Sequence, residues 1–201
     1  MYFFIKRLLD LFLCILSLPF LCVIWIIVAI FIKLEDGGPV FYFAERIGKD
    51  CKKFYMYKFR SMKVNAPNIM NNDGSTYNAE DDPRVTKVGK FIRETSIDEL
   101  PQIINVIKGE MSLIGPRASE WESLDSYLPD EMDKLKMLPG ITGYTQAYYR
   151  NSITPRQKRL YDSWYVNNAS LGLDMKIFFK TIVVVLKHES IYIQIVQNSI
   201  S

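Results

Sequence analysis

The amino-acid sequence predicts an α+β, mainly helical protein whose N-terminal part lies in a membrane. Three features predict this class: an uncharged apolar run over residues 11–32, two short segments rich in strand-forming residues, and helical apolar periodicity in the second half of the chain. The 201 residues suffice for one soluble domain of ordinary size and one membrane-embedded element. We therefore expect a membrane anchor at 1–33 and a single domain at 34–201.

Composition and charge narrow the possible functions. The formal charge of +3, from 25 basic and 22 acidic residues, is too balanced to indicate nucleic-acid binding, although local basic clusters can still meet phosphate or anionic lipid. Cys14, Cys22 and Cys51 form no Cys-x-x-Cys pair and His188 is the single histidine, which argues against a disulfide framework or a zinc site. We expect a reducing, cytosolic location for the polar part. Any metal would be a hard cation held by oxygen atoms, with Mg²⁺ the natural candidate.

The apolar run at 11–32 fits a membrane-embedded helix. At about 1.5 Å per residue it would extend roughly 33 Å, comparable to a hydrocarbon core of about 30 Å. A secretory signal peptide is disfavoured, because Asp10 interrupts the approach from Lys6-Arg7 and no small-residue cleavage site follows the run.

Two topologies remain open for this helix. Ser17 and Pro19 lie inside the run, and an internal proline removes a backbone hydrogen bond and kinks a helix, which favours a re-entrant helix-break-helix. Lysines and arginines flank the run on both sides, which places both flanks on the cytoplasmic side. A straight span is the alternative, because neighbouring groups can satisfy the backbone freed by a proline.

A small β-hairpin is expected after the apolar run. Residues 40–43 and 54–59 are rich in strand formers, and the turn-prone Ile47-Gly48-Lys49-Asp50 separates them. The polar stretch 65–82 contains Asn71-Asn72-Asp73-Gly74-Ser75 and indicates a surface loop.

The next expected element is a helix that starts at Ser96. Ser96 with Glu99 three residues later fits a capping box, Pro101 lies near the first turn, and Gly109 ends the pattern. Its apolar residues trace one helical face, at positions Leu100, Ile103, Ile104 and Ile107.

Two further helices are expected toward the C-terminus. Residues 129–155 are rich in turn-forming residues, and a helix follows at 155–167. Residues 171–186 are strongly apolar, with three lysines within about 40° of each other on a helical wheel: Lys176, Lys180 and Lys187. This pattern fits an amphipathic helix lying at a membrane interface, and equally a helix packed on the protein's own core.

Asp98 and Glu99 are the best candidates for chemistry. A carboxylate at a helix start lies near unsatisfied N–H groups that also favour phosphate, so Asp98 could attack phosphorus if cations neutralise the charge. Glu99 could hold Mg²⁺, which prefers one or two carboxylates with substrate phosphates. The alternative is that both acids only cap a helix. The candidate phosphate-binding cations are Lys58, Arg60, Arg84, Arg93, Arg117 and Arg150.

A set of longer motifs resembles the bacterial sugar transferase family, and more narrowly its small monotopic polyprenyl-phosphate phosphoglycosyl transferases. The resemblance runs from Lys6-Arg7 with Asp10 to about Lys187. The motifs are Lys58-Phe59-Arg60-Ser61-Met62, Asp82-Pro83-Arg84-Val85-Thr86, Gly89 with Arg93, Ser96-Ile97-Asp98-Glu99-Leu100-Pro101-Gln102, Asn105-Val106, Lys108-Gly109-Glu110-Met111-Ser112-Leu113-Ile114-Gly115-Pro116-Arg117 and Pro139-Gly140-Ile141-Thr142-Gly143.

The resemblance implies a specific reaction and site. Asp98 would attack the β-phosphate of a UDP-sugar, release UMP and pass the phosphosugar to undecaprenyl (polyprenyl) phosphate, which begins surface glycan assembly. Glu99, with Asp98, would bind Mg²⁺, and Gly115, Pro116 and Arg117 would lie by the nucleotide and phosphates.

The resemblance also implies a location and partners. The anchor would be a re-entrant helix-break-helix that keeps the catalytic body on the cytoplasmic face of the bacterial inner membrane. Membrane lipids, a second copy of the chain and downstream glycosyltransferases are the expected partners, with no nucleic acid.

The sequence departs from the family pattern at three places. Ala118 stands where proline is usual, Tyr148-Tyr149 lies where Trp and Asn-Gly-Arg are common, and Pro19 is about one turn early. The rival hypothesis is a non-catalytic membrane-anchored scaffold of glycan assembly, in which the basic clusters bind lipid headgroups.

Overall fold

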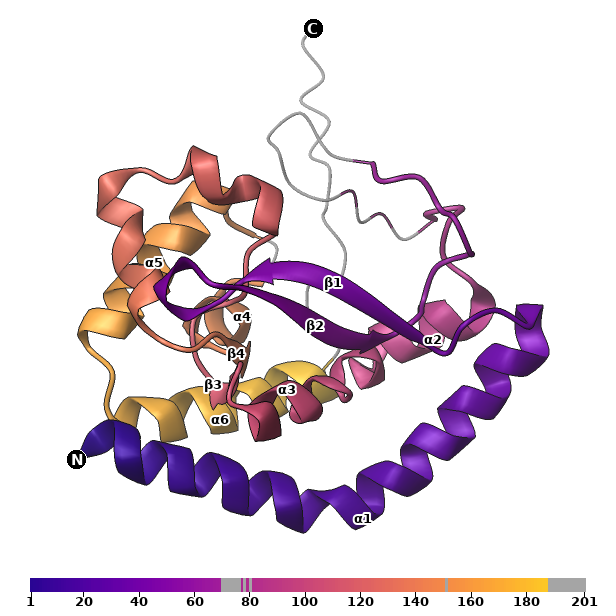
Figure 1. Ribbon diagram of the computed structural model, residues 1–201, viewed down its shortest axis with the longest axis horizontal. Coiled ribbons are helices and arrows are strands. Elements are labelled where there is room, and N and C mark those ends of the chain that lie inside the picture. The colour runs from indigo at the N-terminus through magenta and orange to yellow at the C-terminus, as the bar shows by residue number, and fades with distance from the viewer. Residues whose placement is uncertain (70–76, 78, 80, 151, 188–201) are drawn as a thin grey trace, which may run out of the picture.

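The computed structural model describes residues 1–69, 77, 79, 81–150 and 152–187. The described chain is mainly helical, with two small two-stranded sheets (Figure 1). Residues 71–75 of the predicted loop lie outside the described residues. In chain order the elements are α1 (Tyr2–Asp36), β1 (Phe41–Ile47), η1 (Lys49–Cys51), β2 (Lys53–Phe59), α2 (Lys87–Glu94), η2 (Ile97–Glu99), α3 (Gln102–Lys108), β3 (Ser112–Ile114), η3 (Trp121–Ser126), η4 (Pro129–Lys136), β4 (Gly140–Thr142), α4 (Tyr144–Tyr148), α5 (Pro155–Asn167) and α6 (Leu171–Leu186).

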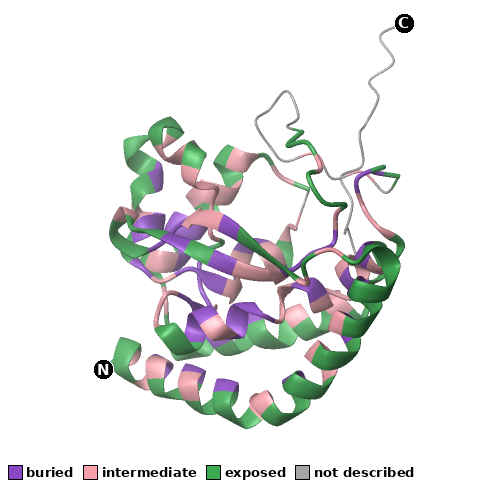
Figure 2. Cartoon of the chain, turned by 45° about the vertical axis from the view of Figure 1, so that its right-hand side comes forward, coloured by how far each residue is buried: buried purple, intermediate pink, exposed green. Residues whose placement is uncertain are grey.

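The helix α1 forms an arc around one side of the molecule (Figure 1). Its inner face is buried against the hairpin, α2 and α3, whereas its outer face exposes large apolar side chains along its length (Figure 2). By length and composition it is the one helix among the described residues that could cross a membrane. Membrane association through this outer face is the simplest way to cover it.

The predicted break of α1 at Ser17 and Pro19 does not interrupt the helix. The backbone stays helical from Tyr2 to Asp36, with Pro19 inside. A proline removes one donor and bends a helix without necessarily ending it. The Ser17 hydroxyl donates to the Cys14 carbonyl at 2.9 Å. The choice between a re-entrant and a spanning helix stays a prediction.

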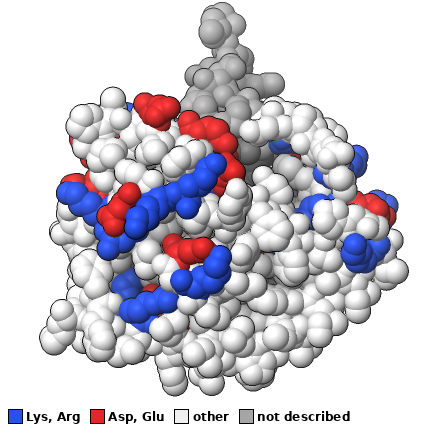
Figure 3. Space-filling model, viewed as in Figure 1, with Lys and Arg blue, Asp and Glu red and all other residues white. Residues whose placement is uncertain are grey.

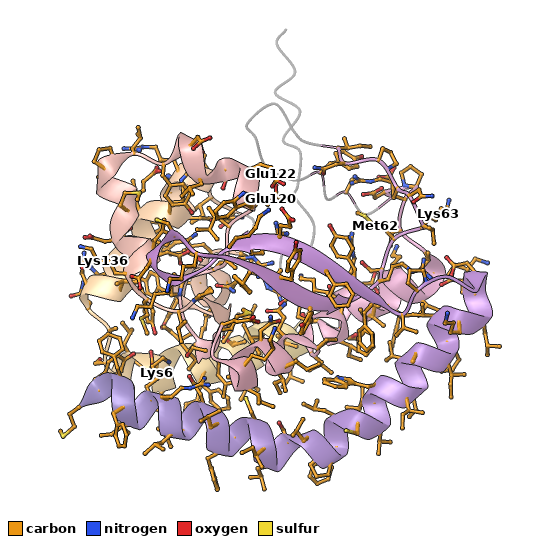
Figure 4. The ribbon with its side chains drawn as sticks, viewed as in Figure 1. Lys6, Met62, Lys63, Glu120, Glu122 and Lys136 are labelled. Atoms are coloured by element: carbon orange, nitrogen blue, oxygen red, sulfur yellow. The ribbon has the colours of Figure 1, made fainter. Side chains whose placement is uncertain are left out.

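Buried polar contacts attach the first turns of α1 to the body. Lys6 lies between α1 and α6 (Figure 4), with its ammonium 2.8 Å from a carboxylate oxygen of Asp174. The hydroxyls of Tyr2 and Tyr165 also donate to Asp174, at 2.9 and 2.6 Å. The Asp10 carboxylate accepts a 2.7 Å hydrogen bond from Ser112. Buried charges need such partners, so these contacts fix how α1 docks.

The predicted β-hairpin is confirmed and is longer than expected. β1 and β2 pair antiparallel, from Phe41 opposite Phe59 to Ile47 opposite Lys53. The first strand outlasts the predicted 40–43 because the register continues to Ile47, whose side chain is buried. One face of the hairpin packs against α3 and the inner face of α1, which places the end of β2 next to the acidic pair.

The second sheet was not predicted. β3 and β4 pair in parallel, with Ser112 opposite Gly140 and Ile114 opposite Thr142. The connection between them passes through η3 and η4, so part of the stretch predicted as turns is helical. Such short strands carry little periodicity that a sequence analysis could detect.

The last two helices match the predicted boundaries. α5 begins with a capping box formed by Thr154 and Gln157. α6 buries Asp174, Ile177 and Val184 against the body, and most of its other apolar residues are exposed. One face of α6 therefore packs on the core, as one of the two interpretations expects, and its location at a membrane interface stays a prediction.

Candidate active site

Asp98 and Glu99 lie in the 3₁₀ turn η2, between α2 and α3. The predicted capping box is wrong: Ser96 adopts a left-handed φ of 58° and makes no side-chain cap, and α3 begins only at Gln102. Gly109 does end α3 in the left-handed conformation, as predicted. The turn leaves Asp98 only 9% exposed and frees the Glu99 side chain for partners distant in sequence.

Two cations converge on this acidic pair. The ammonium of Lys58, from β2, lies 2.7 Å from Glu99 Oε1 and 3.9 Å from Asp98 Oδ2. The guanidinium of Arg117 lies 3.2 Å from the same Glu99 oxygen. Glu99 is thus bound between two cations, whereas Asp98 makes only the longer of these contacts.

The surroundings of the two carboxyls shift their pKa values in opposite directions. Burial raises the pKa of Asp98 to about 6; Lys58 opposes this shift, and the negative charge of Glu99 adds to it. Burial would also raise the pKa of Glu99, but Lys58 and Arg117 outweigh it and lower that pKa to about 2. Glu99 is therefore a fixed anion, and Asp98 is a carboxylate that titrates just below neutral pH.

The segment Gly115-Pro116-Arg117 is held by close backbone contacts. The Gly115 N–H donates to the Thr142 carbonyl and the Gly140 N–H to the Pro116 carbonyl, both at 2.9 Å. A Cβ on Gly143 would lie 1.9 Å from the Gly115 carbonyl oxygen. Only glycine allows the two chains to approach this closely, and the approach directs Arg117 toward Glu99.

The buried Asp162, which was not among the predicted site residues, binds the backbone of Arg117. This carboxylate accepts hydrogen bonds from the Arg117 backbone N–H at 3.1 Å and from the Thr145 hydroxyl at 2.9 Å. The Lys134 ammonium lies 3.2 Å from it. Burial raises the pKa of Asp162, and these donors oppose the shift. The sequence carried one signal for this role: Asp162 is an acidic residue on the buried side of α5.

Two of the predicted phosphate-binding arginines have partners elsewhere in the protein. Arg60 pairs with Asp36 at the end of α1 and donates to the carbonyls of Pro39 and Met62. Arg84 binds both carboxylate oxygens of Asp82 and donates to two backbone carbonyls. Their guanidinium groups stabilise the segments before and after the hairpin.

The remaining two arginines lie in different environments. Arg93, from α2, donates to the Ser61 hydroxyl at 2.8 Å, and its charge lowers the pKa of Asp98. Arg150 follows α4, has a φ of 45°, and donates its N–H to the Thr145 carbonyl. Lys58, Arg93 and Arg117 are therefore the cations whose charges act on Asp98.

Asp98 and Glu99 are the two carboxylates of the site that could hold the predicted magnesium. Among the described residues, no group of three or more histidines, cysteines and acids gathers to hold a metal. Asp98 and Glu99 supply two carboxylates, one of whose oxygens already binds two cations. Mg²⁺ commonly takes one or two carboxylates and completes its shell with phosphate and water oxygens, so a phosphate-bearing substrate would have to supply the rest.

Comparison with known proteins places these residues in a family. The model of the bacterial sugar transferase family matches residues 1–188. The UDP-galactose-lipid carrier transferase of Erwinia amylovora is 41% identical over 200 residues, covering 94% of this chain and 42% of that protein. The undecaprenyl-phosphate galactose phosphotransferase of Salmonella typhimurium is 39% identical, with coverages of 94% and 42%.

A shorter relative matches over most of its length. The exopolysaccharide production protein ExoY of Sinorhizobium fredii is 38% identical over 188 residues, covering 88% of this chain and 83% of that protein. The chain thus spans about two fifths of the first two relatives and most of the third. Because the family match extends from the first turn of α1 to the end of α6, the chain belongs to the bacterial sugar transferase family.

Proposed function

We propose that this protein transfers a sugar 1-phosphate from a UDP-sugar to undecaprenyl phosphate, through a phosphosugar covalently bound to Asp98. The observation that carries the proposal is the pairing of a buried, weakly neutralised carboxylate with a neighbouring acid held by two cations. The names of the Erwinia amylovora and Salmonella typhimurium relatives, which specify UDP-galactose and undecaprenyl phosphate, support the substrate classes.

In the first step, an Asp98 oxygen attacks the β-phosphorus of the UDP-sugar. The bond from this phosphorus to the bridging oxygen breaks, and UMP leaves with the electron pair. Lys58 lies where it offsets the repulsion between the attacking carboxylate and the phosphate. Arg117 is exposed beside Glu99 and can meet a second phosphate oxygen.

In the second step, a phosphate oxygen of undecaprenyl phosphate attacks the same phosphorus. The bond to Asp98 breaks, which restores the carboxylate and forms a diphosphate-linked sugar on the lipid. When bound at Glu99 and Asp98, Mg²⁺ would neutralise phosphate charge. The apolar outer face of α1 and the exposed side of α6 would hold the site at the cytoplasmic face of the membrane.

The charge distribution supports this placement. Figure 3 shows basic and acidic side chains over the body, whereas the lower rim of that face, where the middle of α1 lies, carries almost none. An apolar rim beside a charged body is what a protein at a membrane surface would present to lipid and to a soluble nucleotide sugar. A homodimer and contacts with downstream glycosyltransferases remain predictions.

The test is UMP release from a panel of UDP-sugars by the purified full chain, with Mg²⁺ and undecaprenyl phosphate. We expect one or a few donors to react, Asp98→Asn to abolish release, and the exposed Asp125→Asn control to react normally. Without acceptor, the wild-type chain should gain the mass of one phosphosugar. Near-normal turnover by Asp98→Asn would refute the covalent mechanism. In cells, rescue of glycan assembly by this inactive variant would instead support the scaffold hypothesis.

A further inference from the structure

An apolar groove of about 330 Å³ lies between the β3–β4 pair and the C-terminal half of α6. Its walls include Leu113 and Ile114 from β3 and Ile182 from α6. Thr142 and Thr181 also line it, and their hydroxyls hydrogen-bond each other at 2.8 Å. One hydroxyl thus donates to the other, and the other lining residues are all apolar, so the groove favours an apolar ligand over a polar one.

A short segment of chain joins the groove to a cation of the candidate site. Ile114 ends β3, and Arg117, whose guanidinium contacts Glu99, follows three residues later. Three residues span at most about 10 Å, even when fully extended. One short segment of chain therefore carries an apolar wall at its start and a phosphate-attracting charge at its end.

The groove also opens onto the apolar surface of α6. Phe178, Ile182 and Leu186 both line it and are more than a third exposed. A chain emerging from a bilayer could thus enter the groove from the α6 side without crossing a polar surface.

We propose that this groove binds the isoprene units nearest the phosphate of the polyprenyl phosphate acceptor. The proposal rests on the proposed function, which supplies an amphiphile with an anionic head and an apolar tail. The head would meet the cations at Asp98 and Glu99, and the tail would lie between β3–β4 and α6. The occupant is the isoprenoid chain, and an ordinary lipid acyl chain is the competitor that the test distinguishes.

Two neighbouring residues of α6 give a matched pair of variants. Ile182 lines the groove and is 42% exposed, whereas Val183 does not line it and is 43% exposed. Successive helical residues point about 100° apart, so Ile182→Trp fills the groove and Val183→Trp adds the same bulk elsewhere on the apolar surface. Neither residue belongs to the proposed catalytic machinery.

Kinetics of the full chain in nanodiscs give the first readout. We expect Ile182→Trp to raise the KM for undecaprenyl phosphate about tenfold, which corresponds to about 1.4 kcal/mol. The KM for the UDP-sugar and the acceptor-free burst of UMP should not change, and Val183→Trp should behave like wild type. Equal KM values of the two variants for the acceptor would refute the role of the groove in acceptor binding and leave the proposed function intact.

Photolabelling tests whether the groove binds the isoprenoid chain, and it requires no turnover. The full chain is photolabelled with a polyprenyl phosphate that carries a diazirine next to its phosphate-proximal isoprene. We expect labelled peptides from β3 and α6, with competition by unlabelled undecaprenyl phosphate but not by an excess of dioleoyl phosphatidic acid. Labelling elsewhere, or equal competition by phosphatidic acid, would overturn the proposal. Absence of UMP release from every donor would instead refute the proposed function.

Discussion

Asp162→Asn tests whether a buried carboxylate sets the position of Arg117. Asparagine keeps the shape of the side chain but loses the charge and one acceptor oxygen. Lys134, which is 4% exposed, then loses its carboxylate partner and keeps neutral acceptors, among them the Ser119 hydroxyl 2.9 Å away. Removing one partner of a buried ion pair lowers the free energy of unfolding by about 3–5 kcal/mol. Because Lys134 keeps a hydrogen-bond acceptor, we expect a loss at the lower end of this range.

The expected loss of about 3 kcal/mol can be measured as a shift in thermal unfolding. For a chain of this size, each kcal/mol lowers the unfolding temperature by about 2–4 °C, so we expect about 6–12 °C in detergent micelles. A decrease of less than about 2 °C would show that the buried pair contributes little.

Lys134→Met is the control that separates stability from positioning. It leaves the Arg117 N–H and the Thr145 hydroxyl bound to Asp162, so it should destabilise the fold without moving Arg117. We expect Asp162→Asn to release UMP about tenfold more slowly than Lys134→Met, at a temperature where both variants are folded. A hydrogen bond to a charged group contributes about 1.5–3 kcal/mol, and the exposure of Arg117 reduces this contribution. Equal rates would refute the positioning role.

Three further predictions follow from the site and the docking of α1. Only the carboxylate form of Asp98 attacks, and its pKa is about 6, so the acceptor-free burst of UMP should decrease as the pH falls through 6. Lys58→Met removes a charge that lowers this pKa. A series of burst amplitudes for this variant should therefore show the decrease at higher pH. Lys6→Met should cost about 3 kcal/mol in thermal unfolding, because it leaves Asp174 buried without its cation, and adding Asp174→Asn should recover part of the loss. Gly143→Ala should destabilise the fold by up to about 3 kcal/mol and slow UMP release, since its Cβ would displace the Gly115 backbone; a normal unfolding temperature and rate would contradict this.

Local patterns predicted the helices best. The helices predicted at 155–167 and 171–186 match the observed bounds of α5 and α6. The signals there are local: in α5, Thr154 and Gln157 form a capping box within the first turn. The same kind of signal failed at Ser96. There, charges from β2 and from the segment after β3 bind Glu99, and this long-range pairing competes with the local cap.

The sequence alone could not show which of the predicted cations contact the acidic pair. Lys58, Arg60, Arg84 and Arg117 all lie in motif-like segments and carry the same charge. Only the fold brings Lys58 and Arg117 to the acidic pair, and it commits Arg60 and Arg84 to carboxylates near them. The parallel β3–β4 pair and Asp162 escaped prediction for the same reason, since each depends on segments far apart in sequence.

The way α1 docks also constrains how the protein is made. Lys6 and its partner Asp174 are 168 residues apart, so α1 leaves the ribosome long before α6 exists. At about 5–20 residues per second, the charged inner face of the first turns waits roughly 10–30 s for its partner. During that interval Lys6 lacks Asp174, and Asp10, one helical turn further along α1, is the nearest carboxylate available to it. Synthesis of α6 then supplies Asp174, so the first turns of α1 reach their final contacts only after the last described helix has been made.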